Sequence, residues 1–309
     1  MEIDDCVEEY ICELRLLKRT PETIKGYSKR LRYFERYCEN ARSVSRMEEV
    51  NVALLKSYSL FLIESGVKAI TANGYLTPVK KMFKFAHSEG YVDSDFSRGF
   101  VHQKEDKTVI PCFTEKQVEQ LFGRCKPKRG DSSRDRFIKA RDNAVLTVLF
   151  DSGLRASELC GIRESDMVGD CILIRGKGSK ERVVPITSPM HKAIGKYKHE
   201  RDRYFSDGRF RLDDRLLLTF NGKQLKPKTL GAIFSKLGKG DMFKSVRCSP
   251  HTARHYYAVK MLTSQGASVY EIQRLMGHAN LNYTNIYLSS LTDEELIKNN
   301  RDKSVLMGL

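Results

Sequence analysis

The sequence predicts a mainly α-helical fold with a small β-sheet, split between a helical bundle and a mixed α+β domain. Apolar residues recur every three or four positions through the first hundred residues, as in helices that bury one face. A charged stretch without periodicity follows at 104–112, and two short apolar runs, 171–175 and 182–186, flank the sequence GKGSKE. We therefore expect a helical domain over 1–103, a linker, and a second domain over 113–309.

Start signals and periodicity place four helices in the first domain. The clearest start is Thr20-Pro21-Glu22, which combines a capping hydroxyl, a proline at the first helical position and an acid in the first turn. The expected helices cover about 5–17, 21–41, 51–66 and 71–87.

The second domain is expected to begin at a capping box, Thr114 to Gln117, and a second capping box joins Ser268 to Glu271. The two apolar runs around GKGSKE predict a β-hairpin, and a further short strand is expected at 215–219. Helices are expected at about 134–152, from Arg155 onward, and at about 189–204, 227–237, 251–265, 269–276, 281–290 and 292–309.

Positive charge is concentrated in the second domain. The chain carries a formal net charge of +15, of which residues 1–100 hold only about +1 and the rest of the chain about +14. A basic excess on one part of a folded chain indicates a polyanionic partner, above all a nucleic acid. A basic surface that only favours solubility is the alternative.

Composition argues against several other classes of protein. No apolar run approaches the roughly 18 residues that a membrane span needs, and the first ten residues are acidic, unlike a signal peptide. We therefore expect no membrane partner and a cytoplasmic location. The eight cysteines are scattered, with no CxxC pair, so neither a zinc finger nor a disulfide framework is predicted.

Six residues that suit phosphodiester chemistry occur in a fixed order. They are Arg155 in SGLRASEL, Lys177 in RGKGSKERVVPI, His251 and Arg254 in SPHTARH, His278 in MGHANLNY and Tyr287 in TNIY. Guanidinium groups match the geometry of phosphate oxygens. Lysine and histidine can transfer protons, and tyrosine can act as a covalent nucleophile.

Each of these residues, taken alone, has a simpler interpretation. Arg155 would be a surface arginine, GKGSKER a charged turn, and Tyr283 and Tyr287 core aromatic residues. His251 and His255 have a spacing that zinc ligands use on a helix, but the glutamate of HExxH and a third ligand are missing. We therefore expect no metal site. The joint order and spacing of the motifs favour the enzymatic interpretation.

The ordered motifs resemble those of the tyrosine recombinase (phage integrase) family, and most of all its Xer-type members. The resemblance is strong over about 113–290, whereas the first domain matches in layout only. It implies a two-domain clamp on duplex DNA: an N-terminal, SAM-like core-binding domain and a mixed α+β catalytic domain that ends in a tail helix.

The resemblance also implies a role for each motif residue. Tyr287 is the nucleophile, Arg155 and Arg254 bracket the phosphate, Lys177 protonates the leaving 5′-oxygen, His251 assists proton transfer, His278 hydrogen-bonds the phosphate, and Glu158 supports the site. Lys177 is preferred to Lys180 as the general acid, and Tyr283 is the competing nucleophile. No cofactor is implied.

These roles predict a site-specific recombinase that works through a 3′-phosphotyrosyl intermediate, as in integrases, resolvases and mobile-element enzymes. A type IB-like topoisomerase and a catalytically idle DNA-binding regulator are the alternatives. The implied partner is duplex DNA with an inverted-repeat core site, bound by a homotetramer in the synaptic complex, with a monomer as the alternative form without DNA. The tail, with apolar residues at 305–307 and 309, is expected to dock on a neighbouring subunit or on its own domain.

The distribution of charge predicts the DNA contacts. On the second and fourth helices and in the hairpin, the predicted contacts are Lys25, Lys29, Arg32, Lys80, Lys81, Lys84, Lys180 and Arg182. Tyr256 and Tyr257 stand where the family usually has smaller residues, and we expect neither to touch the catalytic set.

Overall fold

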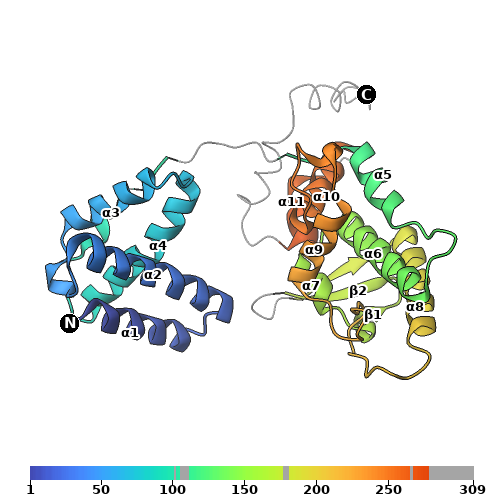
Figure 1. Ribbon diagram of the computed structural model, residues 1–309, viewed down its shortest axis with the longest axis horizontal. Coiled ribbons are helices and arrows are strands. Elements are labelled where there is room, and N and C mark those ends of the chain that lie inside the picture. Colours follow the sequence, from blue (N-terminus) through green and yellow to red (C-terminus); the bar gives the residue numbers. More distant parts are fainter. Residues whose placement is uncertain (101, 105–110, 177–180, 265–266, 278–309) are drawn as a thin grey trace, which may run out of the picture. The chain divides into compact units, whose positions relative to one another are not determined.

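The computed structural model describes residues 1–309 except 101, 105–110, 177–180, 265–266 and 278–309. The chain divides into two compact units, Met1–Thr108 and Val109–Leu309, each with its own hydrophobic core (Figure 1). The predicted fold class, mainly helical with a small sheet, is confirmed. The helices expected at 281–290 and 292–309 lie outside the described residues.

The first unit contains the four helices that periodicity predicted. They are α1 (Ile3–Leu16), α2 (Pro21–Arg42), α3 (Val52–Glu64) and α4 (Ala69–Ser88). α2 begins at the predicted signal, where the Thr20 side-chain oxygen accepts a hydrogen bond from the backbone N–H of Thr23 at 3.3 Å. The core is aromatic at its centre, where the ring of Phe34 packs edge-on against the rings of Tyr58 and Phe83.

The second unit is a helical domain with one three-stranded sheet. Its helices are α5 (Glu115–Arg124), α6 (Ser133–Ser152), α7 (Ala156–Gly161), α8 (Ser188–Tyr204), α9 (Pro227–Leu237), α10 (Pro250–Ser264) and α11 (Val269–Met276). α6 is central, because it packs against α5, α7, α8 and α10. Both predicted capping boxes, at Thr114 and at Ser268, are present.

The sheet is antiparallel with the order β1-β2-β3, formed by Met167–Val168, Cys171–Arg175 and Glu181–Pro185. The predicted hairpin is confirmed as β2 and β3, whereas β1 was not predicted. The strand expected at 215–219 is wrong, since these residues form only isolated bridges. The physical reason is that this run has no single partner strand: the N–H of Leu216 donates to the Ile162 carbonyl oxygen, whereas the Leu217 carbonyl oxygen accepts from the N–H of Leu225.

All eight cysteines are free, and Cys6, Cys38, Cys125 and Cys160 are buried. Burial raises the pKa of the Cys160 thiol to about 12, which makes it a poor nucleophile. Among the helices in the described ranges, none combines the length and the apolar character required to cross a membrane.

Candidate active site

Arg155 is positioned by the start of α7. The helix before it, α6, ends just before Gly153, which has a φ of +60° and forms the C-cap of that helix. The backbone N–H of Arg155 donates to Oε2 of Glu158 at 2.8 Å, and its Nη1 donates to Oε1 of the same carboxylate at 2.9 Å. The Arg155 side chain nevertheless keeps 42% of its surface exposed, so a ligand can reach its guanidinium group.

Glu158 is the buried anion of the site, with only 5% of its side chain exposed. Arg182 of β3 binds both carboxylate oxygens, from Nη1 and from Nη2, at 2.8 Å each. Burial alone would raise the pKa of Glu158, but the hydrogen bonds from Arg182 and from the Arg155 backbone outweigh it and hold the pKa at about 2. Glu158 is therefore an ionised anchor for two arginines and is unsuited to proton transfer near neutral pH.

A stability test follows from this depressed pKa. A carboxylate with a pKa of about 2 in the folded chain contributes stability above its ordinary value of 4.5, and that contribution is lost as the pH falls from 4.5 towards 2. The shift corresponds to about 3 kcal/mol at neutral pH. We expect urea unfolding to show Glu158→Gln less stable than the wild type at pH 7, with the difference shrinking below pH 4.5. A difference that is constant with pH would contradict the assignment.

Arg254 and His251 are positioned by the first turns of α10. The Ser249 side chain accepts the backbone N–H of Thr252 at 3.2 Å, and Pro250 opens the helix. Arg254 is 3% exposed, and its Nη1 and Nη2 donate to the carbonyl oxygens of Gly153 at 2.6 Å and Met276 at 2.8 Å. His251 lies one turn earlier and is exposed.

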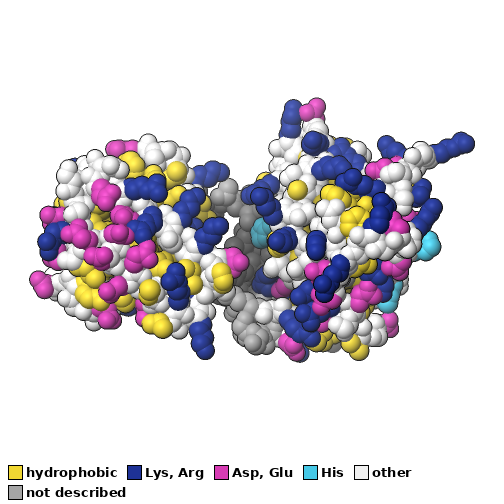
Figure 2. Space-filling view, turned by 60° about the horizontal axis from the view of Figure 1, so that its bottom comes forward, with side chains coloured by type: hydrophobic (Ala, Val, Ile, Leu, Met, Phe, Trp, Pro, Cys, Tyr) yellow, Lys and Arg dark blue, Asp and Glu magenta, His cyan; other side chains and the backbone are white. Residues whose placement is uncertain are grey.

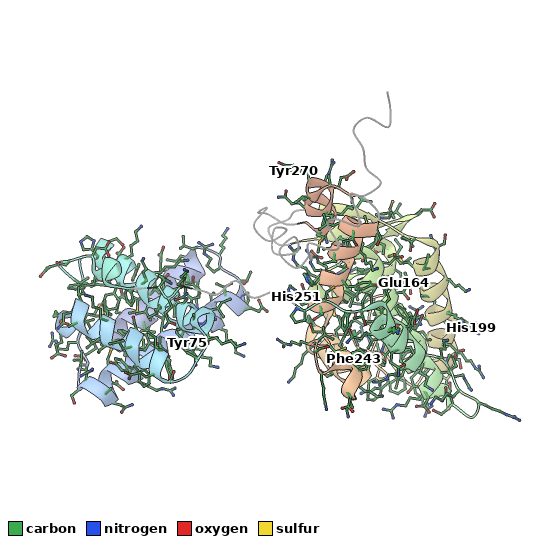
Figure 3. All side chains as sticks on the ribbon, turned by 90° about the horizontal axis from the view of Figure 1, so that it is seen from above. Tyr75, Glu164, His199, Phe243, His251 and Tyr270 are labelled. Carbon is green, nitrogen blue, oxygen red and sulfur yellow. The ribbon has the colours of Figure 1, made fainter. Side chains whose placement is uncertain are left out.

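The electrostatic surroundings of His251 favour its neutral form. Partial burial of the ring, followed by the positive charges of Arg254 and Arg247, lowers its pKa below the ordinary value of 6.5. A neutral imidazole can accept a proton near pH 7, which is the state required of a general base. In Figure 3, His251 lies at one edge of the second unit, and His199 of α8 lies at the opposite edge.

The end of α11 brings the two arginines together. Arg155 donates from Nη2 to the Gly277 carbonyl oxygen at 2.9 Å, and more weakly from Nη1 to that of Met276 at 3.4 Å. Arg254 donates to the same Met276 oxygen. The next residue in the chain is His278, so the structure gathers Arg155, Arg254 and Glu158 around the segment that leads into the last motif. Lys177, Lys180, His278, Tyr283 and Tyr287 themselves lie outside the described residues.

The two tyrosines that follow His255 on α10 have different surroundings. The ring of Tyr257 lies so close to Gly153 that a Cβ placed there would be 2.3 Å from its Cδ1 atom. The carbonyl oxygen of Gly153 accepts a hydrogen bond from Arg254, so Tyr257 packs against a residue that contacts Arg254. Tyr256 instead stacks edge-on with Phe150, away from these contacts.

Two of the charge-based DNA contacts have other partners in the structure. Arg32 forms ion pairs with Asp4, Glu8 and Glu35, and these carboxylates compensate its charge. Arg182 is largely buried on Glu158. Lys25, Lys29, Lys81 and Lys84 are exposed and Lys80 is half-buried. Figure 2 shows acidic side chains interspersed with basic ones on the first unit, whereas Lys and Arg predominate on the displayed face of the second.

The described residues of the site provide hydrogen-bond donors and proton-transfer groups rather than a set of metal ligands. No set of three His, Cys, Asp or Glu side chains is grouped as metal ligands within the part of the chain that is described. The described part of the site therefore presents two guanidinium groups and an imidazole, which suits a phosphate anion.

Both units match known protein families. The profile of the "Phage integrase family" matches residues 111–294, and that of the "Phage integrase SAM-like domain" matches residues 5–103. The chain therefore belongs to the phage integrase family.

Named proteins similar to this chain show which class of enzyme it belongs to within the family. Tyrosine recombinase XerC of Bacillus pumilus (strain SAFR-032) is 30% identical over 268 residues, which cover 86% of this chain and 85% of that protein. Tyrosine recombinase XerA of Thermococcus onnurineus (strain NA1) is 29% identical over 314 residues, with coverage of 99% and 98%. Within its family, this chain is a site-specific tyrosine recombinase.

Solved structures share the fold. A λ integrase fragment (75–356), crystallised as a dimer bound to a COC′ core site, aligns with a TM-score of 0.70 at 15% identity and covers 95% of this chain and 97% of its own. The Tn1549 transposon integrase in complex with a circular intermediate DNA aligns with a TM-score of 0.70 at 18% identity, with coverage of 97% and 99%. These similarities establish the fold class and no more.

Proposed function

We propose that this recombinase cleaves and rejoins duplex DNA at an inverted-repeat core site, with Tyr287 as the nucleophile. The observation that carries the proposal is the convergence of Arg155 and Arg254 on the Met276 carbonyl, directly before the motif that contains His278. Two guanidinium groups held on one side of a fold supply the charge that a phosphodiester needs as its oxygens become more negative.

The proposed reaction is a phosphoryl transfer that needs no cofactor. The Tyr287 oxygen attacks the scissile phosphorus, a 3′-phosphotyrosyl bond forms, and the 5′-oxygen leaves with a proton from Lys177. His251, neutral near pH 7, accepts the proton of the tyrosine hydroxyl, and His278 hydrogen-bonds the phosphate. The covalent bond conserves the energy of the phosphodiester, so the reverse reaction with a partner strand restores intact DNA.

The exposure of the two arginines suggests how the phosphate is received. The Arg155 side chain is 42% exposed, so a phosphate oxygen can reach its guanidinium group. Arg254 is buried against the carbonyl oxygens of Gly153 and Met276, so its contact with the phosphate requires neighbouring groups to move. We propose that DNA binding is coupled to this movement at the end of α11.

Each of the two domains has its own proposed role, DNA binding for the first and catalysis for the second. Residues 1–103 bind the core site through Lys25, Lys29, Lys80, Lys81 and Lys84, 104–112 link the domains, and 113–309 carry catalysis. Arg32 and Arg182 are left out because their charges are compensated within the chain.

Exchange between two duplexes requires four cuts, hence four protomers, which we propose assemble on DNA with exchanged tails. The reaction takes place where the DNA is, in the cytoplasm.

The test of this function begins with a duplex selected by the protein from a random pool. Two copies of that sequence are placed on a supercoiled plasmid, and the full-length protein is added. We expect deletion or inversion of the intervening DNA, and binding that weakens steeply with salt. Relaxation of the plasmid without any recombinant product would contradict the proposal, as would the absence of any selected sequence.

The role of Lys177 has its own test. Lys177→Ala should slow strand cleavage, because the 5′-oxygen would then leave without a proton. A substrate with sulfur in place of that oxygen has a better leaving group, so it should restore cleavage by the variant. The neighbouring Lys180→Ala variant is the matched control. If sulfur restores cleavage to Lys180→Ala and not to Lys177→Ala, the general acid is misassigned.

A further inference from the structure

Arg182 occupies an inward-facing position of the sheet. It pairs with Ile174 across β2 and β3, and along β3 it shares the face of the buried Val184 rather than that of the exposed Val183. Its side chain is only 15% exposed. A charged side chain is rarely placed in such a position unless it is paired, so the contacts of its guanidinium group define what it does.

Three oxygen atoms from two other elements accept hydrogen bonds from this guanidinium group. Both oxygens of Glu158, at the start of α7, accept from Nη1 and Nη2 at 2.8 Å. Nε donates to the carbonyl oxygen of Leu275 in α11 at 3.0 Å. The planar fork therefore joins β3, α7 and α11 at fixed angles, which a lysine ammonium could not do.

Arg182 also lies directly against Gly277. A Cβ built on Gly277 would be 3.0 Å from Nη1 and 3.2 Å from Cζ of Arg182. Gly277 ends α11 with a φ of +65°, and Arg155 holds its carbonyl oxygen. The backbone carbonyls of the three residues before His278 thus accept hydrogen bonds from Arg182, Arg254 and Arg155.

We propose that Arg182 is a positioning residue for strand cleavage, which couples the hairpin strand following Lys177 to Arg155 and to the chain entering His278. This inference rests on the proposed roles of Lys177, Arg155 and His278. Arg182 acts through Glu158, because the same carboxylate receives the backbone and side chain of Arg155. Without the Arg182 guanidinium group, the hairpin strand, Arg155 and the chain entering His278 would no longer be held in fixed positions relative to one another.

A purely stabilising role would predict different behaviour. Removing one partner of a buried ion pair destabilises a fold, so both accounts expect the Arg182 variants to unfold more easily. Only the positioning account expects a folded variant to cleave slowly, since a displacement of about 1 Å at a reacting group can cost about 100-fold in rate. The two explanations separate when cleavage rate and unfolding are measured on the same variants.

The experiment compares Arg182→Met and Arg182→Lys with Arg175→Met, using the duplex selected by the protein and nicked to trap the cleaved strand. Arg175 is the matched control, because it lies on the paired strand of the same hairpin but is 54% exposed on Asp166 and Glu181. We expect both Arg182 variants to cleave about 100-fold more slowly. DNA binding should stay within about twofold, and Arg175→Met should cleave at the wild-type rate.

Two further readouts address positioning specifically. The substrate with a 5′-bridging sulfur should recover about tenfold of the loss in Arg182→Lys, because it bypasses the part that arises from a displaced Lys177. Adding Glu158→Gln to Arg182→Met should cost little more, because the two residues act as one unit. Thermal unfolding of each variant shows whether the protein is folded at the assay temperature, and Arg182→Lys serves if Arg182→Met is not.

The outcomes are distinct. Cleavage by a folded Arg182→Lys at the wild-type rate overturns the proposal, as do additive losses with Glu158→Gln or the absence of any sulfur rescue. If the wild type forms no adduct, the proposed function fails and this inference fails with it. If the wild type cleaves and sulfur rescues Lys177→Ala, the function stands and the Arg182 variants alone decide.

Discussion

Tyr287→Phe should form no covalent protein–DNA adduct on a nicked duplex, while its affinity for that duplex stays within about twofold of the wild type. The change removes the hydroxyl group, whose oxygen is the only protein atom that becomes bonded to DNA in the proposed mechanism. Adduct formation is measured by denaturing gel electrophoresis of a labelled strand, and affinity by a mobility shift.

The matched control for this variant is Tyr283→Phe. It removes the same hydroxyl four positions earlier in the same motif, so it tests whether the loss is specific to one tyrosine. We expect it to form the adduct. The reverse pattern, with an adduct from Tyr287→Phe and none from Tyr283→Phe, would reassign the nucleophile.

Arg254→Ala should reduce the rate of strand cleavage by at least about 100-fold to 1,000-fold, the usual effect of removing one donor that stabilises transition-state charge. It should also destabilise the fold. Arg254 is buried and donates to the carbonyl oxygens of Gly153 and Met276. Leaving a buried acceptor unsatisfied costs about 1–3 kcal/mol. Single-turnover cleavage and urea unfolding measure the two effects.

Two companion variants separate charge from geometry. Arg254→Lys keeps the charge and loses the fork, so we expect cleavage to fall while DNA binding is retained. Arg209→Ala also removes one positive charge, but its side chain is 75% exposed on a surface ion pair with Asp207, so it should cleave normally. A folded Arg254→Ala protein that cleaves within about tenfold of the wild type would contradict the proposed role.

The fold class could be predicted from sequence because its signals are local. Helical periodicity and caps such as those at Thr20 and Ser268 involve residues only three or four positions apart. The hairpin could also be predicted, since two apolar runs flank a short turn. The segment at 215–219 has the composition of a strand but is buried on both sides, and its surroundings are set by tertiary packing.

The site could be predicted only as a set of residues in order. That Arg155 and Arg254 share the Met276 oxygen depends on where α11 ends in space, and no local pattern encodes that placement. Charge alone also did not reveal that Arg32 and Arg182 pair with carboxylates, because Asp4, Glu8 and Glu158 lie far away from them in the sequence. For Arg182 a signal was present: it stands two residues before Val184, on the inward face of the strand.

The central claim is that a tyrosine of the last motif becomes joined to DNA. Trypsin should release residues 275–298 as one peptide, because the segment between Arg274 and Lys298 contains no other Lys or Arg. After incubation with the nicked duplex and nuclease trimming, mass spectrometry should find a nucleotide on this peptide, with fragment ions placing it on Tyr287. A nucleotide on Tyr283, on another residue, or on none would contradict the claim.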